Sequence, residues 1–272
     1  MSAIRTVLCV AAGLLLCSAA RAAESPPDPD RVDVWLKMRA HLFGERGIVR
    51  DTGRIVTLRA PARAQDAATV PISISTHLPQ APERYVSRLY LLIDSNPSPL
   101  GAVFSFTPDS GRADIDTRVR VEDYGWMRVV AELSDGSLYM DQRYVKAAGG
   151  CSAPYGTAPD FDAFTPRARL KVDASVSPHE PVLAQLMIQH PNSSGLAKDQ
   201  ITHLFIPPYF VRTVQVTYAG RPILTAEVDF TISENPNFRF YFQAAEAGEL
   251  KATVVDTKDR RIESSARVEI AP

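Results

Sequence analysis

The chain of 272 residues is 45% hydrophobic, and its 30 Lys and Arg nearly balance its 31 Asp and Glu. This length suits one large domain or two domains of ordinary size. Because the sequence has no basic stripe and no block of like charge, it argues against nucleic acid or an anionic membrane surface as a partner.

Residues 1–23 have the pattern of a signal peptide. A short, positively charged start precedes an apolar run over residues 6–20, which has the length of a signal-peptide hydrophobic region. The run is shorter than the roughly 20 residues of a membrane span. Small residues predict cleavage after Ala22 or Ala23, and a bulky neighbour disfavours a lipid anchor at Cys17. We therefore expect a periplasmic protein without a membrane span.

The first half of the mature chain begins with a helix and continues as strands. Asp30 is the expected N-cap of a helix over residues 31–43, which Gly44 ends. The hydrophobic period then becomes two, and turn residues separate the segments. The expected strands are 55–58, 70–74, 88–94, 103–106, 115–121, 127–133 and 138–145.

The strand pattern lapses over residues 147–166 and then resumes. The expected strands of the second half are 170–176, 182–188, 210–219, 223–232, 238–242, 250–255 and 262–270. Many short strands at regular spacing predict an all-β fold with two antiparallel sandwiches in tandem. We divide the chain into a signal peptide at 1–23, a first domain at 24–146, an arm and linker at 147–166, and a second domain at 167–272.

The cysteines single out one residue of the arm. Cys9 and Cys17 leave with the signal peptide, so only Cys151 remains. An unpaired cysteine in an exported protein implies an intermolecular bond or a free reactive thiol. A buried, inert cysteine is the structural alternative, but Gly149 and Gly150 make a poor core segment and instead predict a flexible arm. A coil of ten to fifteen residues spans roughly 20 Å, enough to reach a partner.

The sequence predicts a modestly reactive thiol and no catalytic machinery. An unperturbed cysteine has a pKa of about 8.5, and Lys146 is the nearest cation, so we expect the thiolate to be slightly favoured. No histidine lies in a local cysteine-protease signature. His190 and His203 lack the companion ligands of a zinc site. We therefore predict no metal, no cofactor and no enzymatic activity of its own.

Several other residues have simpler structural interpretations. Asp94 and Asn96 are most simply turn residues, and Trp35 and Trp126 are expected in the core. Asn192 begins a glycosylation sequon, which we discount because such matches are frequent by chance.

Two sets of short motifs resemble a known pair of families. The first half resembles SoxY, the sulfur-compound carrier, and the second half resembles its partner SoxZ. The SoxY-like motifs are Leu58 with Ala60-Pro61, Asp66-Ala67, Val70-Pro71, Asn96-Pro97 with Pro99, Arg118-Val119-Arg120, Asp135-Gly136, and Val145-Lys146 before Gly149-Gly150-Cys151. The SoxZ-like motifs are His190-Pro191 with Gly195, Lys198-Asp199, Val214 with Val216-Thr217, Gly220, and Ser233-Glu234-Asn235-Pro236. In this order they resemble the fused SoxYZ-like carriers associated with quinoprotein dehydrogenases.

The resemblance implies an immunoglobulin-like sandwich for each half and covalent attachment of cargo at Cys151. The implied partners are periplasmic oxidoreductases or hydrolases that load and unload Cys151, among them a quinoprotein dehydrogenase or a cytochrome c. In SoxY the carrier cysteine lies at the very end of the chain. Here the chain continues into the second domain, so the arm is tethered at both ends and its reach is shorter.

Three functions remain open at this point. The leading hypothesis is a periplasmic carrier that holds a sulfur species, or another small intermediate, on Cys151. The first rival is a non-covalent docking or adaptor module for a periplasmic quinoprotein (alcohol) dehydrogenase system, in which Cys151 is dispensable. The second is a redox-sensing thiol that forms a reversible dimer or mixed disulfide.

Overall fold

The structure is a computed structural model that describes residues 25–51, 53–154, 161 and 163–271. The predicted signal peptide at 1–23 and part of the predicted linker lie outside the described residues. Over the described ranges, no helix is both long and apolar enough to cross a membrane.

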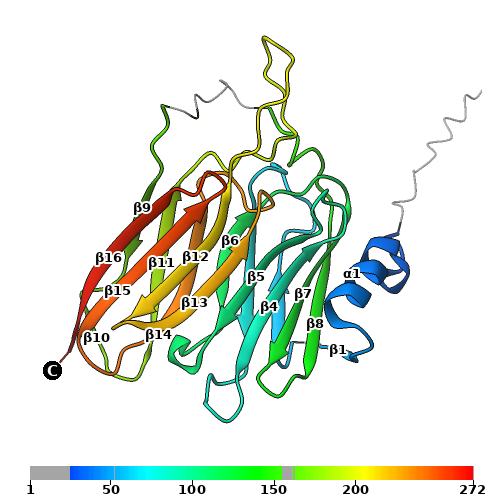
Figure 1. Ribbon diagram of the computed structural model, residues 1–272. Helices are drawn as coiled ribbons and strands as arrows, with labels where there is room; N and C mark the ends of the chain where they lie inside the picture. Colours follow the sequence, from blue (N-terminus) through cyan, green and yellow to red (C-terminus); the bar gives the residue numbers. More distant parts are fainter. Residues whose placement is uncertain (1–24, 52, 155–160, 162, 272) are drawn as a thin grey trace, which may run out of the picture.

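The described chain consists almost entirely of β-strands (Figure 1). It starts with a 3-10 helix, η1 (Pro29–Arg31), and one α-helix, α1 (Asp33–Phe43). The strands of the first half are β1 (Ile48–Arg50), β2 (Val56–Arg59), β3 (Val70–Thr76), β4 (Val86–Ile93), β5 (Leu100–Phe106), β6 (Ile115–Val119), β7 (Gly125–Leu133) and β8 (Leu138–Val145), with the 3-10 helix η2 (Pro108–Ser110) after β5. The strands of the second half are β9 (Arg167–Lys171), β10 (Ser175–Val176), β11 (Pro181–Gln189), β12 (Val211–Tyr218), β13 (Arg221–Val228), β14 (Asn237–Gln243), β15 (Gly248–Asp256) and β16 (Arg261–Ile270).

Both sheets run without a break from one half into the other. The described strands form a sheet in the order β1-β8-β7-β4-β5-β13-β12-β15-β16-β10 and a second in the order β2-β3-β6-β14-β11-β9. The halves join where β5 pairs with β13, from Phe106 opposite Leu224 to Ala102 opposite Val228, and where β6 pairs with β14. The predicted all-β class with a short N-terminal helix is confirmed, whereas the sharing of both sheets was not predicted.

One hydrophobic core fills the space between the two sheets. Alternating strand residues of both halves point into it, as the period-two pattern requires. It extends from Val56 and Phe104 in the first half to Phe240 and Val268 in the second. The rings of Phe104 and Phe238 meet edge to face across the junction, with centroids 6.2 Å apart. The two halves therefore form one sandwich with a common core.

Helix α1 covers the outer face of the long sheet, beside β8 in Figure 1. Trp35 and Phe43 pack there against a separate apolar cluster. The guanidinium of Arg128 lies 4.6 Å from the centre of the Trp35 ring and forms a buried ion pair with Asp94. Asp94 is thus more than the turn residue that the sequence suggested.

Two local predictions for this region were wrong. Asp30 does not cap the helix, because residue Val32 occupies the N-cap position of α1 and Asp28 caps η1 instead. Trp126 is only half-buried, since its indole nitrogen donates to the carbonyl of Pro27 at the surface.

The common core predicts that the two halves unfold together. Phe104→Ala should lower the free energy of unfolding by about 3–5 kcal/mol, because it leaves a cavity at the junction. Urea unfolding can be followed by the fluorescence of the two tryptophans, both in the first half, and by hydrogen exchange of β15 in the second. The loss of stability should be the same by tryptophan fluorescence and by hydrogen exchange of β15. A loss confined to the first half would contradict a common core. Val49→Ala, at a residue that is 48% exposed, is the control with little expected effect.

Candidate functional site

Cys151 lies on the segment that leaves β8, where loops from both halves meet. The segment runs beside the residues that follow β6. The amide of Gly149 donates to the carbonyl of Glu122 at 2.7 Å, and the amide of Gly150 donates to that of Val121 at 3.0 Å. The arm is therefore docked on the first half by backbone hydrogen bonds.

The Glu122 carboxylate binds the arm at the cysteine itself. Its Oε2 accepts the amide of Cys151 at 2.8 Å and the amide of Ser152 at 3.1 Å. Its Oε1 accepts the hydroxyl of Ser152 at 2.8 Å. Hydrogen bonds to a charged acceptor are stronger than neutral ones, so Glu122 makes the main polar contact with the arm.

The second half closes over the arm from the other side. The Ser194 hydroxyl donates to the carbonyl of Cys151 at 2.5 Å. We call the contacts of Glu122 and Ser194 with Cys151 and Ser152 the latch. Asn96 supports it, since its side chain accepts the amide of Glu122 and donates to the carbonyl of Arg120, both at 2.9 Å. Asn96 lies in a turn, as predicted, with its amide donating to the carbonyl of Ile93, and its side chain also positions Glu122.

Gly150 is required in this conformation for steric reasons. A Cβ at this position would overlap the carbonyl oxygen of Ala67 and lie 2.7 Å from that of Val121. Around Gly149 no atom lies within 4 Å of such a Cβ, although its φ of +79° favours glycine. The arm flexibility assigned to both glycines stays a prediction, while close packing supplies an independent reason for Gly150.

The docked thiol is buried and unreactive. Only 2% of Cys151 is exposed. Burial raises the pKa of its thiol to about 12, and the nearby Glu122 and Asp229 carboxylates add to the effect against the opposing charge of Arg120. At neutral pH the docked thiol is therefore protonated. The expectation of a slightly favoured thiolate beside Lys146 was wrong, because folding buries the thiol and, as a smaller effect, brings in a carboxylate that lies 29 residues away in the sequence.

A pocket with a volume of about 340 Å³ opens beside the cysteine. Its walls come from the loop before β3, the end of β6, the arm and two loops of the second half. We call it the cysteine pocket. Its lining residues are Asp66, Ala68, Thr69, Arg120, Cys151, Ala153, Pro154, Ser194 and Glu234. The pocket has room for a small group attached to the sulfur.

The other candidate residues do not join this site. His190 is fully buried against Tyr209, with its Nε2 3.6 Å from Asp256, while His203 lies on an exposed loop. Over the ranges that the structure describes, no group of three or more His, Cys, Asp and Glu is arranged to hold a metal ion. Asn192 of the discounted sequon is fully buried and donates to the carbonyl of Ile232 at 2.6 Å.

Sequence reasoning missed Glu122, Arg120 and Ser194 as parts of the site. They are 29, 31 and 43 residues from Cys151, so no spacing rule connects them. The available signal was the set of short motifs quoted for the resemblance. The pieces of this set that meet around the cysteine are Asp66-Ala67, Asn96, Arg120, Gly149-Gly150-Cys151 and Ser233-Glu234.

Comparison with known proteins accounts for both halves of this sandwich. Residues 39–151 match the family model of the sulfur oxidation protein SoxY, and residues 170–267 match that of the sulphur oxidation protein SoxZ. The first match ends at the candidate cysteine. No sequence among the curated proteins matches this chain.

Two solved structures illustrate the fold similarity. The sulfur carrier protein SoxY from Chlorobium limicola f thiosulfatophilum is 27% identical, covers 41% of this chain and 89% of its own, and has a TM-score of 0.34. The superoxide reductase (neelaredoxin) from Ignicoccus hospitalis is 13% identical, covers 39% of this chain and 80% of its own, and has a TM-score of 0.30. Because both TM-scores are below 0.5, the assignment rests on the two sequence matches.

The two matches, which follow one another along the chain, define a member of the SoxY and SoxZ families of sulfur oxidation proteins. The chain is a fused SoxYZ-like protein, with a SoxY domain followed by a SoxZ domain in one polypeptide. The predicted resemblance is confirmed at this level.

The latch predicts how fast the thiol reacts. Glu122→Gln should raise the rate of alkylation of Cys151 by iodoacetamide roughly tenfold to a hundredfold, because each hydrogen bond to a charged group contributes about 1.5–3 kcal/mol. Ser194→Ala removes a neutral hydrogen bond and should raise the rate roughly twofold to tenfold. The measurement is the alkylated fraction against time by intact mass spectrometry.

Two further variants make this test specific. Gly150→Ala should expose the thiol while leaving the core folded, because the added methyl group overlaps Ala67 only when the arm is docked. Glu249→Gln, an equivalent change on an exposed residue of β15, should leave the rate unchanged. Equal rates in Glu122→Gln and the native protein would show that the latch does not hold the arm.

The buried His190 predicts a loss of stability in mild acid. Burial is the largest cause that lowers the pKa of His190 to about 4, against the opposing influence of Asp256. In the unfolded chain His190 is protonated below about pH 6.5, whereas in the folded chain it is protonated only below about pH 4. The free energy of unfolding therefore falls as the pH decreases through this window. Between pH 7 and pH 5 the loss from this residue is about 2 kcal/mol.

Urea unfolding at the two pH values measures this contribution. His190→Asn keeps an acceptor for the amide of Asn192, which donates to the His190 ring at 3.0 Å. The variant should be less sensitive to the change from pH 7 to pH 5 than the native protein. The same sensitivity in both proteins would contradict the assignment.

Proposed function

We propose that this protein is a periplasmic covalent carrier that binds a sulfur-containing or other small intermediate on Cys151 and presents it to partner enzymes. The observation that carries the proposal is how the cysteine is buried. Among the described residues, Cys151 belongs to none of the hydrophobic clusters, and polar contacts from the latch hold its segment instead. A structural cysteine is fixed by core packing, whereas hydrogen bonds to a surface arm can be exchanged for water.

The arm then has two states. In the docked state the thiol is hidden and protonated, so it does not react with stray oxidants or electrophiles. In the released state Cys151 is away from Glu122, and its pKa returns toward that of an ordinary cysteine. Each latch hydrogen bond contributes on the order of 1–3 kcal/mol, so a partner that binds only the released arm can offset their loss.

Loading as a disulfide-type adduct is a two-electron oxidation. A sulfur–sulfur bond forms between Cys151 and the cargo sulfur, each sulfur loses its proton if it carries one, and two electrons pass to a partner oxidoreductase. Unloading breaks the bond between Cys151 and the cargo sulfur. With a hydrolase, the hydroxyl of water goes to the cargo sulfur and its proton to Cys151. In thiol exchange, the incoming thiolate takes the cargo sulfur and Cys151 leaves as a thiolate. A carbon fragment held as a thioester or hemithioacetal is the other chemistry open to a thiol carrier. In each case the carrier supplies the attachment atom and the partners supply the catalysis.

The proposed location and partners follow from the signal peptide pattern and the family. We place the carrier in the periplasm, with oxidoreductases or hydrolases that load and unload it. A quinoprotein dehydrogenase or a cytochrome c is the proposed electron-accepting partner. The tether at both ends limits how deeply Cys151 can enter a partner, so these enzymes must have accessible sites.

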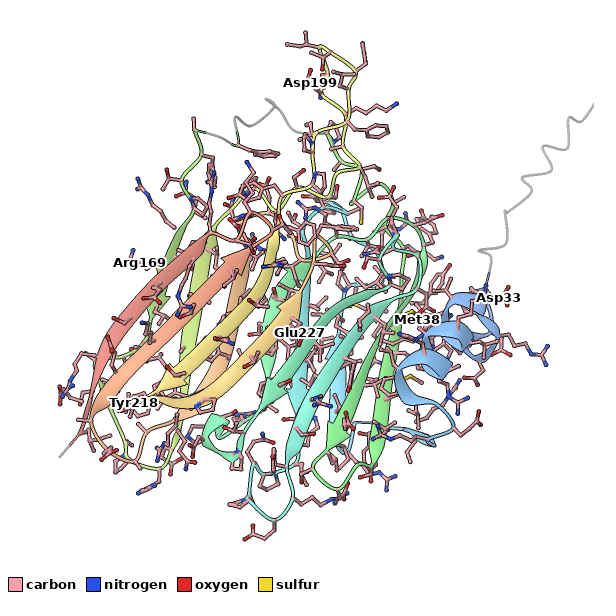
Figure 2. All side chains as sticks on the ribbon, in the orientation of Figure 1. Asp33, Met38, Arg169, Asp199, Tyr218 and Glu227 are labelled. Atoms are coloured by element: carbon pink, nitrogen blue, oxygen red, sulfur yellow. The ribbon has the colours of Figure 1, made fainter. Side chains whose placement is uncertain are left out.

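A non-covalent docking module is the alternative, and one surface feature favours it. The loop that carries Asp199 projects beyond the end of the sheets (Figure 2). On it Ile201, Leu204 and Phe205 are 89%, 69% and 62% exposed. Large exposed apolar side chains gathered in one place mark interaction surfaces. In this alternative the loop binds a dehydrogenase and Cys151 has no role.

The carrier proposal predicts that Cys151→Ser abolishes function in the cell and leaves folding intact. Serine has nearly the same shape, but its oxygen does not form the disulfide-type adducts of a thiol. The first measurement is intact mass spectrometry of the native protein from the periplasm, with and without reductant. An added mass that reductant removes from the peptide containing Cys151 supports a sulfur adduct.

Other outcomes separate the alternatives. A bare thiol that alkylates freely during active metabolism, together with full function of Cys151→Ser, would exclude the carrier and favour the docking module. Replacement of Leu204 and Phe205 by serine should then abolish function, while in the carrier it should only weaken delivery. A dimer that reductant separates on a gel would indicate the redox-sensing thiol.

A further inference from the structure

The cysteine pocket is acidic. Asp66 and Glu234 line it, and Glu122 binds the arm directly behind the sulfur. Asp229 acts on the same thiol from the second half. Among the described lining residues, Arg120 is the one with a positive charge. The surroundings of the sulfur therefore carry an excess of negative charge.

Arg120 is committed to holding the two halves together. It is 5% exposed, and its Nη1 donates to the carbonyls of Phe230 at 2.7 Å and Ile232 at 2.8 Å. Its charge partly offsets the carboxylates, but Asp66 and Glu234 in the pocket lining, together with Glu122, which binds the arm, outnumber it, so the local charge opposes a further negative charge. A negatively charged group attached to this sulfur meets the same opposition as the thiolate.

We infer that the charge of the group carried on Cys151 sets the position of the arm: a small neutral or cationic group fits the cysteine pocket with the latch closed, whereas an anionic group opens the latch and holds the arm outside. This inference rests on the proposed carrier function and specifies how its site discriminates among cargo classes. The anionic class includes sulfonates and other sulfur oxyanions.

The repulsion between like charges is strong enough, relative to the latch hydrogen bonds, to move the arm. Two like charges a few ångströms apart repel several times more strongly near a protein surface than when both are fully in water. The latch consists of a few hydrogen bonds, each of modest net strength, so one added charge is enough to change which arm position is more populated. An anionic adduct would then be offered to partners, and removal of its charged part would let the arm dock and hide the thiol again.

The test uses synthetic adducts on the full mature chain. Methanethiosulfonate reagents place aminoethyl, hydroxyethyl or sulfonatoethyl groups on Cys151. The thiolate attacks the sulfenyl sulfur, a disulfide forms, methanesulfinate leaves and the thiol proton passes to solvent. Hydrogen exchange of the amides of residues 149–152 then reports docking, because these amides donate to Glu122 and Val121.

We expect the sulfonatoethyl adduct to lose at least tenfold in amide protection relative to the hydroxyethyl adduct, and the aminoethyl adduct to lose none. Added salt should reduce the difference, since exposed charges are screened. A trimethylammonioethyl adduct controls for bulk, because it is also large but cationic. Equal protection of the sulfonatoethyl and hydroxyethyl adducts would overturn the inference, as would equal loss with both large groups.

A variant links the effect to the pocket. Asp66 and Glu234 are exposed at its mouth and make no latch contact, so Asp66→Asn with Glu234→Gln should restore protection to the sulfonatoethyl adduct. Glu249→Gln is the matched distant control and should restore none. Because the adducts are synthetic, the result does not depend on which cargo the cell supplies. If the synthetic adducts do not behave as expected, this inference fails, while the native adduct can still be measured to test the carrier proposal. If no native adduct is found, the carrier proposal fails whatever the synthetic adducts show.

Discussion

The Glu122 carboxylate accepts three hydrogen bonds from two consecutive residues of the arm. Ser194, on the other side of the arm, contributes one hydrogen bond to this segment. The position of Glu122 depends on Asn96, which holds the amide of this residue, and on the strand β6 that precedes it. The same β6 pairs with β14 of the second half. The placement of the thiol is therefore tied to the junction between the two halves.

One carboxylate has two effects on the cysteine. It holds the arm against the protein, and its negative charge opposes ionisation of the thiol. Both effects would end together if the arm left, so the proposed release would expose the sulfur and restore its acidity in one step. In the proposed carrier, a separate device for activating the thiol is unnecessary, since partner enzymes would meet only the released arm. Burial and protonation of the docked thiol protect it from oxidants, and the same two properties make its reactions slow.

Local patterns predicted the strands well and their assembly poorly. The predicted strand 138–145 coincides with β8, and the turn at Gly220 joins β12 and β13 as expected, because alternation and turn chemistry are local properties. The pairing of β5 with β13 has no local signal, since it depends on complementarity between strands more than a hundred residues apart. Burial of Cys151 was missed for a related reason. Its neighbours have the composition of a loop, and the residue that docks them comes from elsewhere in the sequence.

The position of the docked arm explains how the chain can continue past Cys151 into the second domain. In the docked state the arm already lies between the halves, with Glu122 on one side and Ser194 on the other. Continuing into the second domain therefore requires no movement of the docked cysteine. Because both sides of the latch are in one polypeptide, closure is intramolecular and does not depend on the concentration of a partner chain. The tether also shortens the reach of the arm. In the proposed carrier, delivery therefore depends on the balance between docked and released states rather than on the length of the arm.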